Sequence, residues 1–500
     1  MSERYLLGVD NGGTVAKAAL FDLTGKELAI ARRNIELEMP HADWHEIDSD
    51  RLWQATAEAI REVIRDAKVA AKEIVSVSCT GHGNGLYLVD EAGRPTRKGI
   101  SSSDSRARDY VENWNQDGII EKLRPKTLQC NWPAQPNALL RWMIDNEPET
   151  LQRSRWALMC KDYVRMRLTG EAHAELTDYS GTSLMDVRKG EYDDEIFEAF
   201  GIESTRKLMP PVVRSTQAAG SISASAASET GLAEGTAVYG GAFDIDACGL
   251  AAGCIDPDSM VMVGGTWGNN QYITPEPLCS ADVFMVSRYA IDGYYLVLEG
   301  SATSASNLEW FVDLMLADQR QQSSNVYRWC DNAVGESAPT ISAPMFLPFL
   351  YGSPVNPNAT GTFLGLTGQT DRAAMARAIF EGVCFMHHWH WDRLMQFRPC
   401  PKIISMTGGV ARSEVWCQMF ADVFNVPVQV PEAEELGALG AAMIASIGHG
   451  IYPDLAAACE QMTRINRRHE PRSEQHAVYS ARRKRFLATL DALCPIWNSL

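Results

Sequence analysis

Three glycine-containing turns are the positions at which this sequence is best equipped to bind phosphate. They are Asn11-Gly12-Gly13-Thr14, Gly264-Gly265-Thr266 and Gly408-Gly409, the last directly before a helical stretch. Glycine accepts positive φ angles and lets successive backbone N–H groups converge on an anionic oxygen. The hydroxyls of Thr14 and Thr266 add two donors. Each turn alone is also common in ordinary hairpins, so phosphate binding is a hypothesis for each.

Two charged residues beside the first turn fit the needs of a nucleotide phosphate. Asp10 ends a buried strand, where its carboxylate can hold a water of a Mg²⁺ shell. Lys17 can reach a transferring phosphate as a point charge. The usual nucleotide motifs are absent: G-x-x-x-x-G-K-[ST] does not occur, and Gly81 to Gly85 does not read G-x-G-x-x-G.

Apolar periodicity predicts the elements that carry these turns. Around the first turn it predicts strands over 5–9, 16–22, 27–33 and 74–78 and a helix over 50–69. A similar opening recurs in the second half, with strands over 260–263, 271–274 and 294–298. Later elements are helices over 374–393, 414–424 and 435–447, a strand over 403–407 and a solvated terminal helix over 467–485. This weak similarity between the two halves of the chain predicts two related α/β domains with a boundary near 246–256.

Length and composition agree with two domains. A chain of 500 residues is too long for one ordinary core, so we expect domains over 1–250 and 251–500. The formal net charge of −17 argues against nucleic-acid and anionic-membrane partners. None of the twelve cysteines forms a C-x-x-C pair, which leaves zinc and a redox dithiol unsupported. Residues 1–20 lack a signal-peptide pattern, so we expect a cytoplasmic location, and a homodimer stays open.

Short segments in order along nearly the whole chain resemble the FGGY family of carbohydrate kinases, within the superfamily of sugar kinases, actin and heat-shock ATPases. They include 8–14, 161–163 with 167–170, 240–244, 265–266, 348–352, 361–366, 381–383 and 408–413. The resemblance implies an α/β fold of two ribonuclease-H-like domains with ATP and sugar in the cleft between them. Domain 1–250 would carry sugar binding, the first phosphate loop and the catalytic base, and domain 251–500 the second phosphate loop and adenosine binding.

The resemblance also implies individual roles. Asp244 matches the catalytic base, which accepts the proton of the sugar hydroxyl that attacks the γ-phosphate of ATP. An ordinary carboxylate, with a pKa of about 4, is a weak base at neutral pH, so orienting the hydroxyl is expected to matter more than removing its proton. A helix N-cap is the compatible structural alternative for Asp244. Gly408, Gly409 and Ser413 match the adenosine loop.

Sugar contacts are implied for His82, Gly83 and Asn84, together with Asp244 itself. Xylulose kinases tend to carry Gln-Met-His-Gly in this loop, so Asn84 replaces a histidine and puts D-xylulose in doubt. The amide of Asn84 still donates and accepts hydrogen bonds. Asp104, in an Asp-x-Arg string with Arg106, either contacts the sugar or only pairs with that arginine. The strings 83–85, 102–104 and 118–119 are most similar to the L-xylulose kinase branch.

The implied reaction is transfer of phosphate from ATP, with Mg²⁺, to a small sugar, with a ketopentose such as L-xylulose as the leading substrate. Alternatives within this class are D-xylulose, glycerol and other polyols. A more distant alternative is a non-catalytic nucleotide-binding protein of the actin or heat-shock type. Such proteins share the phosphate hairpins but lack the Gly-Gly-x-x-Asp segment that ends at Asp244.

Overall fold

The computed structural model describes residues 4–322 and 325–499. Residue contacts divide the chain into two compact units. The first contains Met1–Ile255, Ile273–Val297 and Ala433–Arg464, and the second contains Asp256–Tyr272, Leu298–Glu432 and Ile465–Leu500. This division differs from a single boundary near residue 250, because two later segments pack with the first unit. One of them carries helix α16 (Leu436–Gly448), which packs on strands β1 (Tyr5–Asn11) and β6 (Ile74–Gly81).

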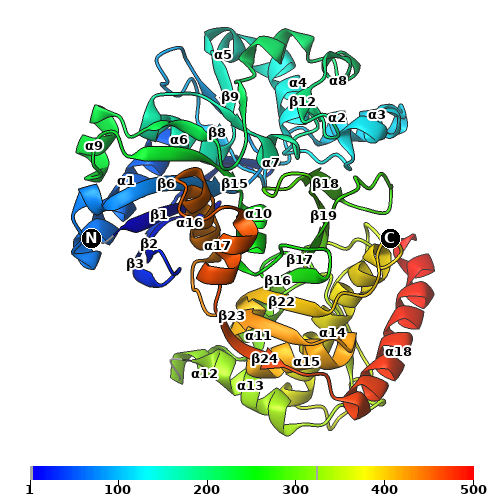
Figure 1. Cartoon of the computed structure of the whole chain (residues 1–500). Helices are drawn as coiled ribbons and strands as arrows, with labels where there is room; N and C mark the ends of the chain where they lie inside the picture. The colour runs from blue at the N-terminus through cyan, green and yellow to red at the C-terminus, as the bar shows by residue number, and fades with distance from the viewer. Residues whose placement is uncertain (1–3, 323–324, 500) are drawn as a thin grey trace. The chain divides into compact units, whose positions relative to one another are not determined.

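The first unit is built around a six-stranded sheet in the order β14-β15-β6-β1-β2-β3 (Figure 1). Its other strands are β2 (Val15–Asp22), β3 (Glu27–Asn34), β14 (Ala218–Ser221) and β15 (Ala237–Phe243). Strands β1, β2 and β3 form the predicted antiparallel meander, while β6 runs parallel to both β1 and β15. Every residue of β1 is buried, which explains its continuous apolar run.

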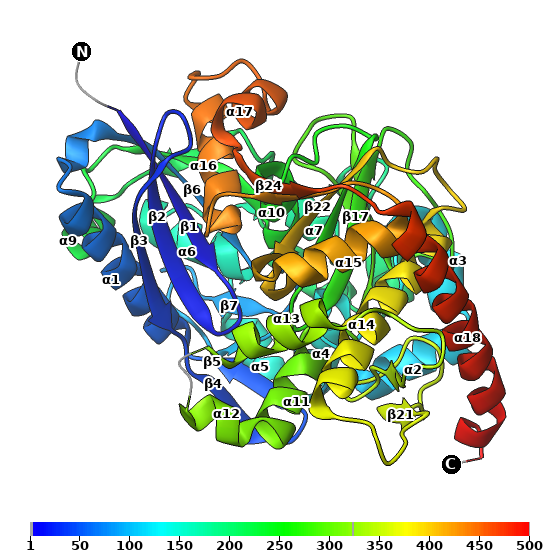
Figure 2. The ribbon, with the colours of Figure 1, turned by 90° about the horizontal axis from the view of Figure 1, so that it is seen from below.

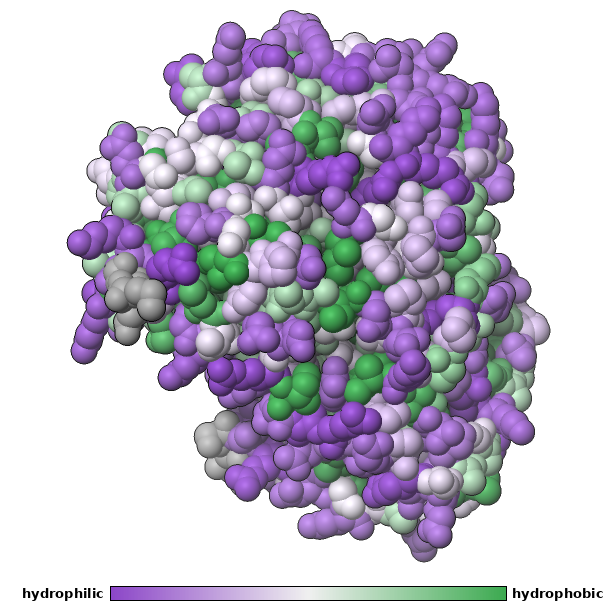
Figure 3. All heavy atoms as spheres, viewed as in Figure 1, coloured by the Kyte–Doolittle hydropathy of each residue, from purple (hydrophilic) through white to green (hydrophobic). Residues whose placement is uncertain are grey.

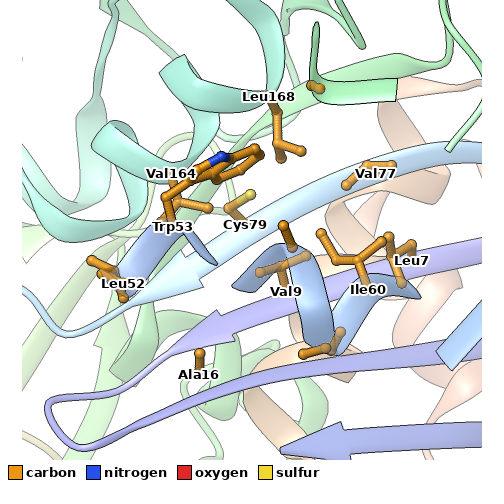
Figure 4. Packing of buried hydrophobic residues seen from close by; sticks show 14 of the residues in the cluster. Leu7, Val9, Ala16, Leu52, Trp53, Ile60, Val77, Cys79, Val164 and Leu168 are labelled. Carbon is orange, nitrogen blue, oxygen red and sulfur yellow. The ribbon is translucent and has the colours of Figure 1, made fainter. Parts of the chain in front are cut away.

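Helices cover the meander of this sheet. Helix α1 (Ser49–Ala67) packs on β2 and β3, and Figure 2 shows the meander between α1 and α16. The buried side of α1 includes Leu52, Trp53 and Ile60, which meet Val9 and Val77 of the sheet in one apolar core (Figure 4). Asp48 caps this helix by accepting hydrogen bonds from two backbone N–H groups of its first turn.

A second sheet has the order β18-β19-β17-β16-β22-β23-β24, with β18 at Met285–Arg288. The second unit contains β16, β22, β23, β24 and parts of β17 and β19. Their bounds are β16 (Ser259–Gly264), β17 (Gly268–Thr274), β19 (Tyr295–Ser301), β22 (Ile403–Gly408), β23 (Val428–Pro431) and β24 (Ile465–His469). Strand β16 pairs antiparallel with β17 and parallel with β22, as β1 pairs with β2 and β6. The predicted similarity between the two halves is therefore a repeat of the same pattern of strand pairing. The main helices here are α11 (Ser306–Met315), α13 (Val326–Glu336), α14 (Arg372–Leu394), α15 (Glu414–Phe424) and α18 (Ser473–Trp497).

The prediction of one terminal helix over 467–485 is wrong at its start. Arg467 and Arg468 lie in β24 and pair with Val430 and Gln429 of β23, and the helix begins at Ser473. A charged edge strand has no apolar alternation to distinguish it from a solvated helix. On the face in Figure 3, hydrophilic residues predominate and hydrophobic ones lie in small, separate areas. Among the helices described, none is both long and apolar enough to cross a membrane.

Candidate functional site

The sheet of the first unit gathers three of the sequence-predicted segments at one edge. Strands β1, β6 and β15 are parallel and adjacent, so their carboxyl ends lie together. Asn11 of β1 and Phe243 of β15 both stand beside Gly81 of β6. The first phosphate turn, the sugar loop and the start of helix α10 (Asp244–Ala251) all leave the sheet at this edge. The topology therefore brings together residues that are more than two hundred positions apart in the chain.

Asp10 and Lys17 form an ion pair in which a third residue takes part. The Lys17 Nζ lies 3.2 Å from Asp10 Oδ2 and 3.1 Å from Glu435 Oε2, and Glu435 also accepts a hydrogen bond from Arg32 at 2.6 Å. Burial raises the pKa of Asp10 despite the nearby ammonium group. Gly437, at the start of α16, makes room for this carboxylate, because a Cβ there would lie 2.7 Å from Asp10 Oδ2. Sequence reasoning missed Glu435, which follows a loop in the other half of the chain.

The first phosphate turn is anchored by Asn11. Its Nδ2 donates to Thr56 Oγ1 of α1 at 2.8 Å, and its side chain is fully buried. The backbone N–H of His82 donates to the Asn11 carbonyl at 2.9 Å, which ties the turn to the sugar loop. Thr14 is exposed, and Gly12 and Gly13 are partly exposed. The side chain of Asn11 thus holds the turn, and the part that stays accessible is Gly12-Gly13-Thr14.

Asp244 is the first residue of α10, and Phe243 occupies the N-cap position. Asp244 as a whole residue is half-buried. Desolvation, together with the nearby carboxylates of Asp10 and Asp178, raises its pKa to about 8. The ordinary pKa assumed from the sequence is therefore wrong. A carboxylate with this pKa is a much stronger base than an ordinary one once it is ionised.

The sugar loop places two buried polar side chains with unused hydrogen-bonding capacity. Asn84 adopts a left-handed conformation, with φ of 60°, and is 4% exposed. Its Oδ1 has no hydrogen-bond partner among the described residues. His82 Nε2 contacts the Tyr87 hydroxyl at 2.9 Å, and its Nδ1 is likewise without a partner in the described part of the chain. Burial lowers the pKa of His82 to about 4, so the ring is neutral at pH 7.

Gly83 lies against the residue that precedes Asp244. A Cβ on Gly83 would stand 2.3 Å from the Phe243 ring, so no larger residue fits without displacing that ring. The sugar loop therefore packs directly against Phe243, the N-cap residue of α10.

Asp104 pairs with Arg106, as one of the two sequence alternatives expects. Asp104 Oδ1 accepts from the Arg106 backbone N–H and from its Nε, each at 2.9 Å. Its Oδ2 accepts from Arg106 Nη2 at 2.9 Å and from the His45 backbone N–H at 2.7 Å. With its carboxylate so engaged and 2% exposed, Asp104 is better suited to fix this loop than to bind a ligand directly. A sugar contact by Asp104 stays a prediction.

A buried charge network behind Asp244 was missed by sequence reasoning. The Lys161 Nζ lies within 3.4 Å of carboxylate oxygens of Asp162, Glu175 and Asp178, and all four side chains are at most 1% exposed. The motif Lys161-Asp162-Tyr163 was recognised only as part of a resemblance. Asp162 follows Lys161 directly in the chain, but Glu175 and Asp178 lie just before and within α7 (Leu176–Tyr179), and no spacing in the sequence indicates that these two meet Lys161.

In the second unit, the two remaining glycine turns meet because β16 and β22 are parallel neighbours. Gly264 stands opposite Gly408 in the register, and a Cβ on Gly408 would lie 2.8 Å from the Gly264 carbonyl oxygen. Thr266 is exposed in the hairpin between β16 and β17. Beneath the hairpin, His387 of α14 contacts Asn270 at 2.9 Å and Ser304 at 3.2 Å. This buried pair of contacts supports the second turn and was not predicted.

A cavity of about 470 Å³ opens beside the third glycine turn. Its walls include Gly409 and Ser413 of the predicted adenosine loop. Aromatic and charged residues complete it: Tyr327, Phe380, Trp416, Glu309, Arg328, Asp331 and Arg412, with Ala305, Leu308 and Asn325. Ser413 caps α15 by accepting from the Trp416 N–H at 3.0 Å, and its hydroxyl donates to Asp331. The size and the mixed aromatic and polar walls suit a nucleoside.

Comparisons with known proteins give a consistent result. Residues 5–251 match the model of the N-terminal domain, and residues 260–449 that of the C-terminal domain, of the FGGY family of carbohydrate kinases. A Pasteurella multocida protein named "Probable L-xylulose kinase" is 37% identical over 98% of this chain and 99% of its own. The Escherichia coli "L-xylulose/3-keto-L-gulonate kinase" is 35% identical, with 98% and 97% covered. The crystal structure of xylulose kinase from Rhodospirillum rubrum superposes with a TM-score of 0.89 at 26% identity, covering 99% and 100%.

Proposed function

Since the chain belongs to the FGGY family of carbohydrate kinases and is an ATP-dependent sugar kinase, we propose that its substrate is a ketopentose, namely L-xylulose. The observation that carries this proposal is the buried sugar loop, in which Asn84 Oδ1 and His82 Nδ1 lack partners among the described residues. Unpaired buried polar atoms are costly and are expected to find partners when a ligand binds. A polyhydroxylated sugar supplies such partners.

We propose that Asp244 accepts the proton of the attacking sugar hydroxyl. Its position at the carboxyl end of β15, beside the turn that follows β1, supports this role. Its raised pKa supports it too, because a base with a pKa near the operating pH is the most effective. In a loose phosphoryl-transfer transition state the orientation of the hydroxyl contributes as well, and the fixed start of α10 provides it.

The phosphates would be bound at the turns Gly12-Gly13-Thr14 and Gly265-Thr266, by the Gly13 N–H and by the hydroxyls of Thr14 and Thr266. The N–H groups of Gly12 and Gly265 would hold these turns, since they donate to the Val15 and Trp267 carbonyls at 3.1 and 3.2 Å. Lys17 would balance phosphate charge from its present place between two carboxylates. Adenosine would occupy the cavity at Gly408, Gly409 and Ser413, where the aromatic walls can stack on a base. The side chain of Asn11 would contribute by holding the first turn, not by contacting the phosphates.

Magnesium is the proposed cofactor, and Asp10 fits it. A single carboxylate at a strand end, beside a phosphate turn, suits a cation that keeps several waters and phosphate oxygens as ligands. Within residues 4–322 and 325–499, no three His, Cys, Asp or Glu side chains are gathered as metal ligands. Asp10 would therefore hold the ion through water, and the ion would neutralise phosphate charge. The proposed location is the cytoplasm, where ATP is available.

The name of the Escherichia coli relative raises 3-keto-L-gulonate as a second candidate substrate. This sugar carries a carboxylate, which binds best next to a cation. Among the residues predicted to bind the sugar, His82 is held neutral, Asn84 is uncharged, and the charge of Asp104 is already paired with Arg106. We therefore propose that neutral L-xylulose is preferred over the acid.

A panel of sugars tests the proposal directly. We expect ADP release to give the highest kcat/KM with L-xylulose, compared with D-xylulose, 3-keto-L-gulonate, glycerol and other polyols. Asn84→His should change the ratio of kcat/KM between L-xylulose and D-xylulose by about ten-fold or more, because a mispaired buried polar group costs about 1–3 kcal/mol. The KM for ATP should stay nearly unchanged. A stable variant with an unchanged sugar ratio would show that Asn84 only shapes the turn.

Asp244→Asn is the control that separates catalysis from binding. We expect kcat to fall by about two to four orders of magnitude with every sugar, because the positioned base is lost. A well-folded variant that keeps more than about a tenth of wild-type kcat would remove Asp244 from this role.

A further inference from the structure

The backbone directly before Asp244 is held by a buried side chain that does not reach the reacting atoms. Thr177, in α7, accepts a hydrogen bond through Oγ1 from the backbone N–H of Phe243 at 2.9 Å. The same hydroxyl donates to Glu175 Oε2 at 2.7 Å. Because the single hydroxyl proton is committed to Glu175, a lone pair of the oxygen faces Phe243. The Phe243 N–H is therefore the donor in this contact, and the Thr177 hydroxyl oxygen is the acceptor.

Glu175 is in turn fixed from several sides. Its Oε1 accepts from the Ser215 hydroxyl at 2.8 Å and from the Thr177 backbone N–H at 3.0 Å. The Lys161 Nζ lies 3.4 Å from its Oε2, and neither side chain is exposed. Polar contacts on both carboxyl oxygens, from three side chains and the Thr177 backbone N–H, fix the orientation of this group. Glu175 thus acts as a rigid support for the Thr177 hydroxyl.

Phe243 is contacted on two further sides. Thr80 of β6 donates to the carbonyl of the preceding residue, Ala242, at 2.8 Å. The ring of Phe243 lies against Gly83 of the sugar loop. Since Phe243 is the N-cap residue of α10 and Asp244 is its first residue, a shift of the Phe243 backbone moves the Asp244 carboxylate with it.

We propose that Thr177, supported by Glu175, is a positioning residue for phosphoryl transfer, because it fixes the Phe243 backbone and so aims the Asp244 carboxylate at the sugar hydroxyl. The inference rests on the proposed role of Asp244 as base. Displacing a reacting group by about 1 Å can cost about 100-fold in rate, so a distant hydroxyl can matter to kcat.

Thr177→Val and Thr177→Ser form the test. Valine keeps the shape and removes the hydroxyl, and we expect kcat to fall by about 10- to 100-fold. Serine keeps the hydroxyl, and we expect kcat within about three-fold of wild type. The KM for ATP should stay within about two-fold in both, because neither variant touches the cavity at Gly409.

Thr230 offers a matched control in α9 (Ala224–Thr230). It is fully buried, its hydroxyl donates to the Ala226 carbonyl at 2.6 Å, and it accepts from the Leu232 backbone N–H at 3.2 Å. Thr230→Val, like Thr177→Val, loses one donated and one accepted hydrogen bond of a buried hydroxyl. Its Tm should therefore fall while its kcat stays near wild type. Should Thr177→Val fail to fold, Ser215→Ala weakens the same support from one step further away, and kcat should fall by about three-fold or more.

The outcomes distinguish the two ideas. If Asp244→Asn is inactive while folded Thr177→Val keeps wild-type kcat, the positioning role is overturned and the base assignment stands. The positioning role is also overturned if Thr177→Val and Thr230→Val lose the same Tm and have the same kcat. If Thr177→Val does not fold, Ser215→Ala takes its place, and an unchanged kcat in Ser215→Ala overturns the role. If Asp244→Asn stays active, the base assignment fails first, and the positioning role falls with it. A loss of kcat in Thr177→Val that serine restores supports the proposal.

Discussion

The chemistry of the Asp244 carboxyl depends strongly on its surroundings. Burial and the carboxylates of Asp10 and Asp178 raise its pKa from the ordinary 3.8 to about 8. A base must be ionised, so we expect kcat/KM to rise with pH up to about 8 instead of levelling off above about pH 5. The folded state also binds this proton more tightly than the unfolded state, so the resulting stabilisation is complete below pH 3.8 and is lost as pH rises toward about 8. Asp244→Asn should therefore gain in free energy of unfolding relative to wild type across this range. Rate profiles and urea unfolding at several pH values check both statements, and an acidic limb near pH 4 would contradict the first.

Helix α16 is the element that joins the late segment to the first unit, and its small residues make this approach feasible. A Cβ on Gly440 would stand 2.0 Å from the Ala247 carbonyl oxygen of α10, the helix that begins with Asp244. In an ordinary helix, Gly→Ala stabilises by about 1 kcal/mol. Here we expect the opposite sign for Gly440→Ala, a loss of about 1–3 kcal/mol from overpacking, seen as a lower Tm. Gly368→Ala is the control, since a Cβ there would meet nothing within 4 Å. Equal Tm values for Gly440→Ala and wild type would show that the two helices have room to separate.

At the scale of the whole molecule, the proposed reaction needs groups from both units. Asp10 and Asp244 belong to the first unit, and the cavity at Gly409 and the turn at Thr266 belong to the second. One ATP has to meet both sets, so we expect a non-hydrolysable ATP analogue and the sugar together to reduce the radius of gyration in small-angle scattering. Closure of this kind excludes water and limits wasteful hydrolysis of ATP. Either ligand alone should have a smaller effect, and a radius that does not change with both would argue against closure.

The sequence by itself determined the local elements and the order of the motifs. Helix 414–424 was predicted with its observed bounds, and the meander after Tyr5 with errors of one or two residues, because apolar periodicity and glycine turns are local signals. The family followed from the order of short segments, which the domain matches over 5–251 and 260–449 confirm. The start of the helix predicted over 467–485 was wrong, because its first residues belong to a polar edge strand that carries no periodic signal, while the helix itself begins at Ser473.

Only the tertiary structure decided which residues act together. The order β15-β6-β1 brings Asp244 to the edge at which β1 ends, one residue after Asp10, and sheet order is set by pairing between distant segments. The return of α16 places Glu435 beside Lys17, and the packing of α7 places Thr177 beneath Phe243. The raised pKa of Asp244 has the same origin, since desolvation depends on everything that surrounds a group and not on its neighbours in the chain.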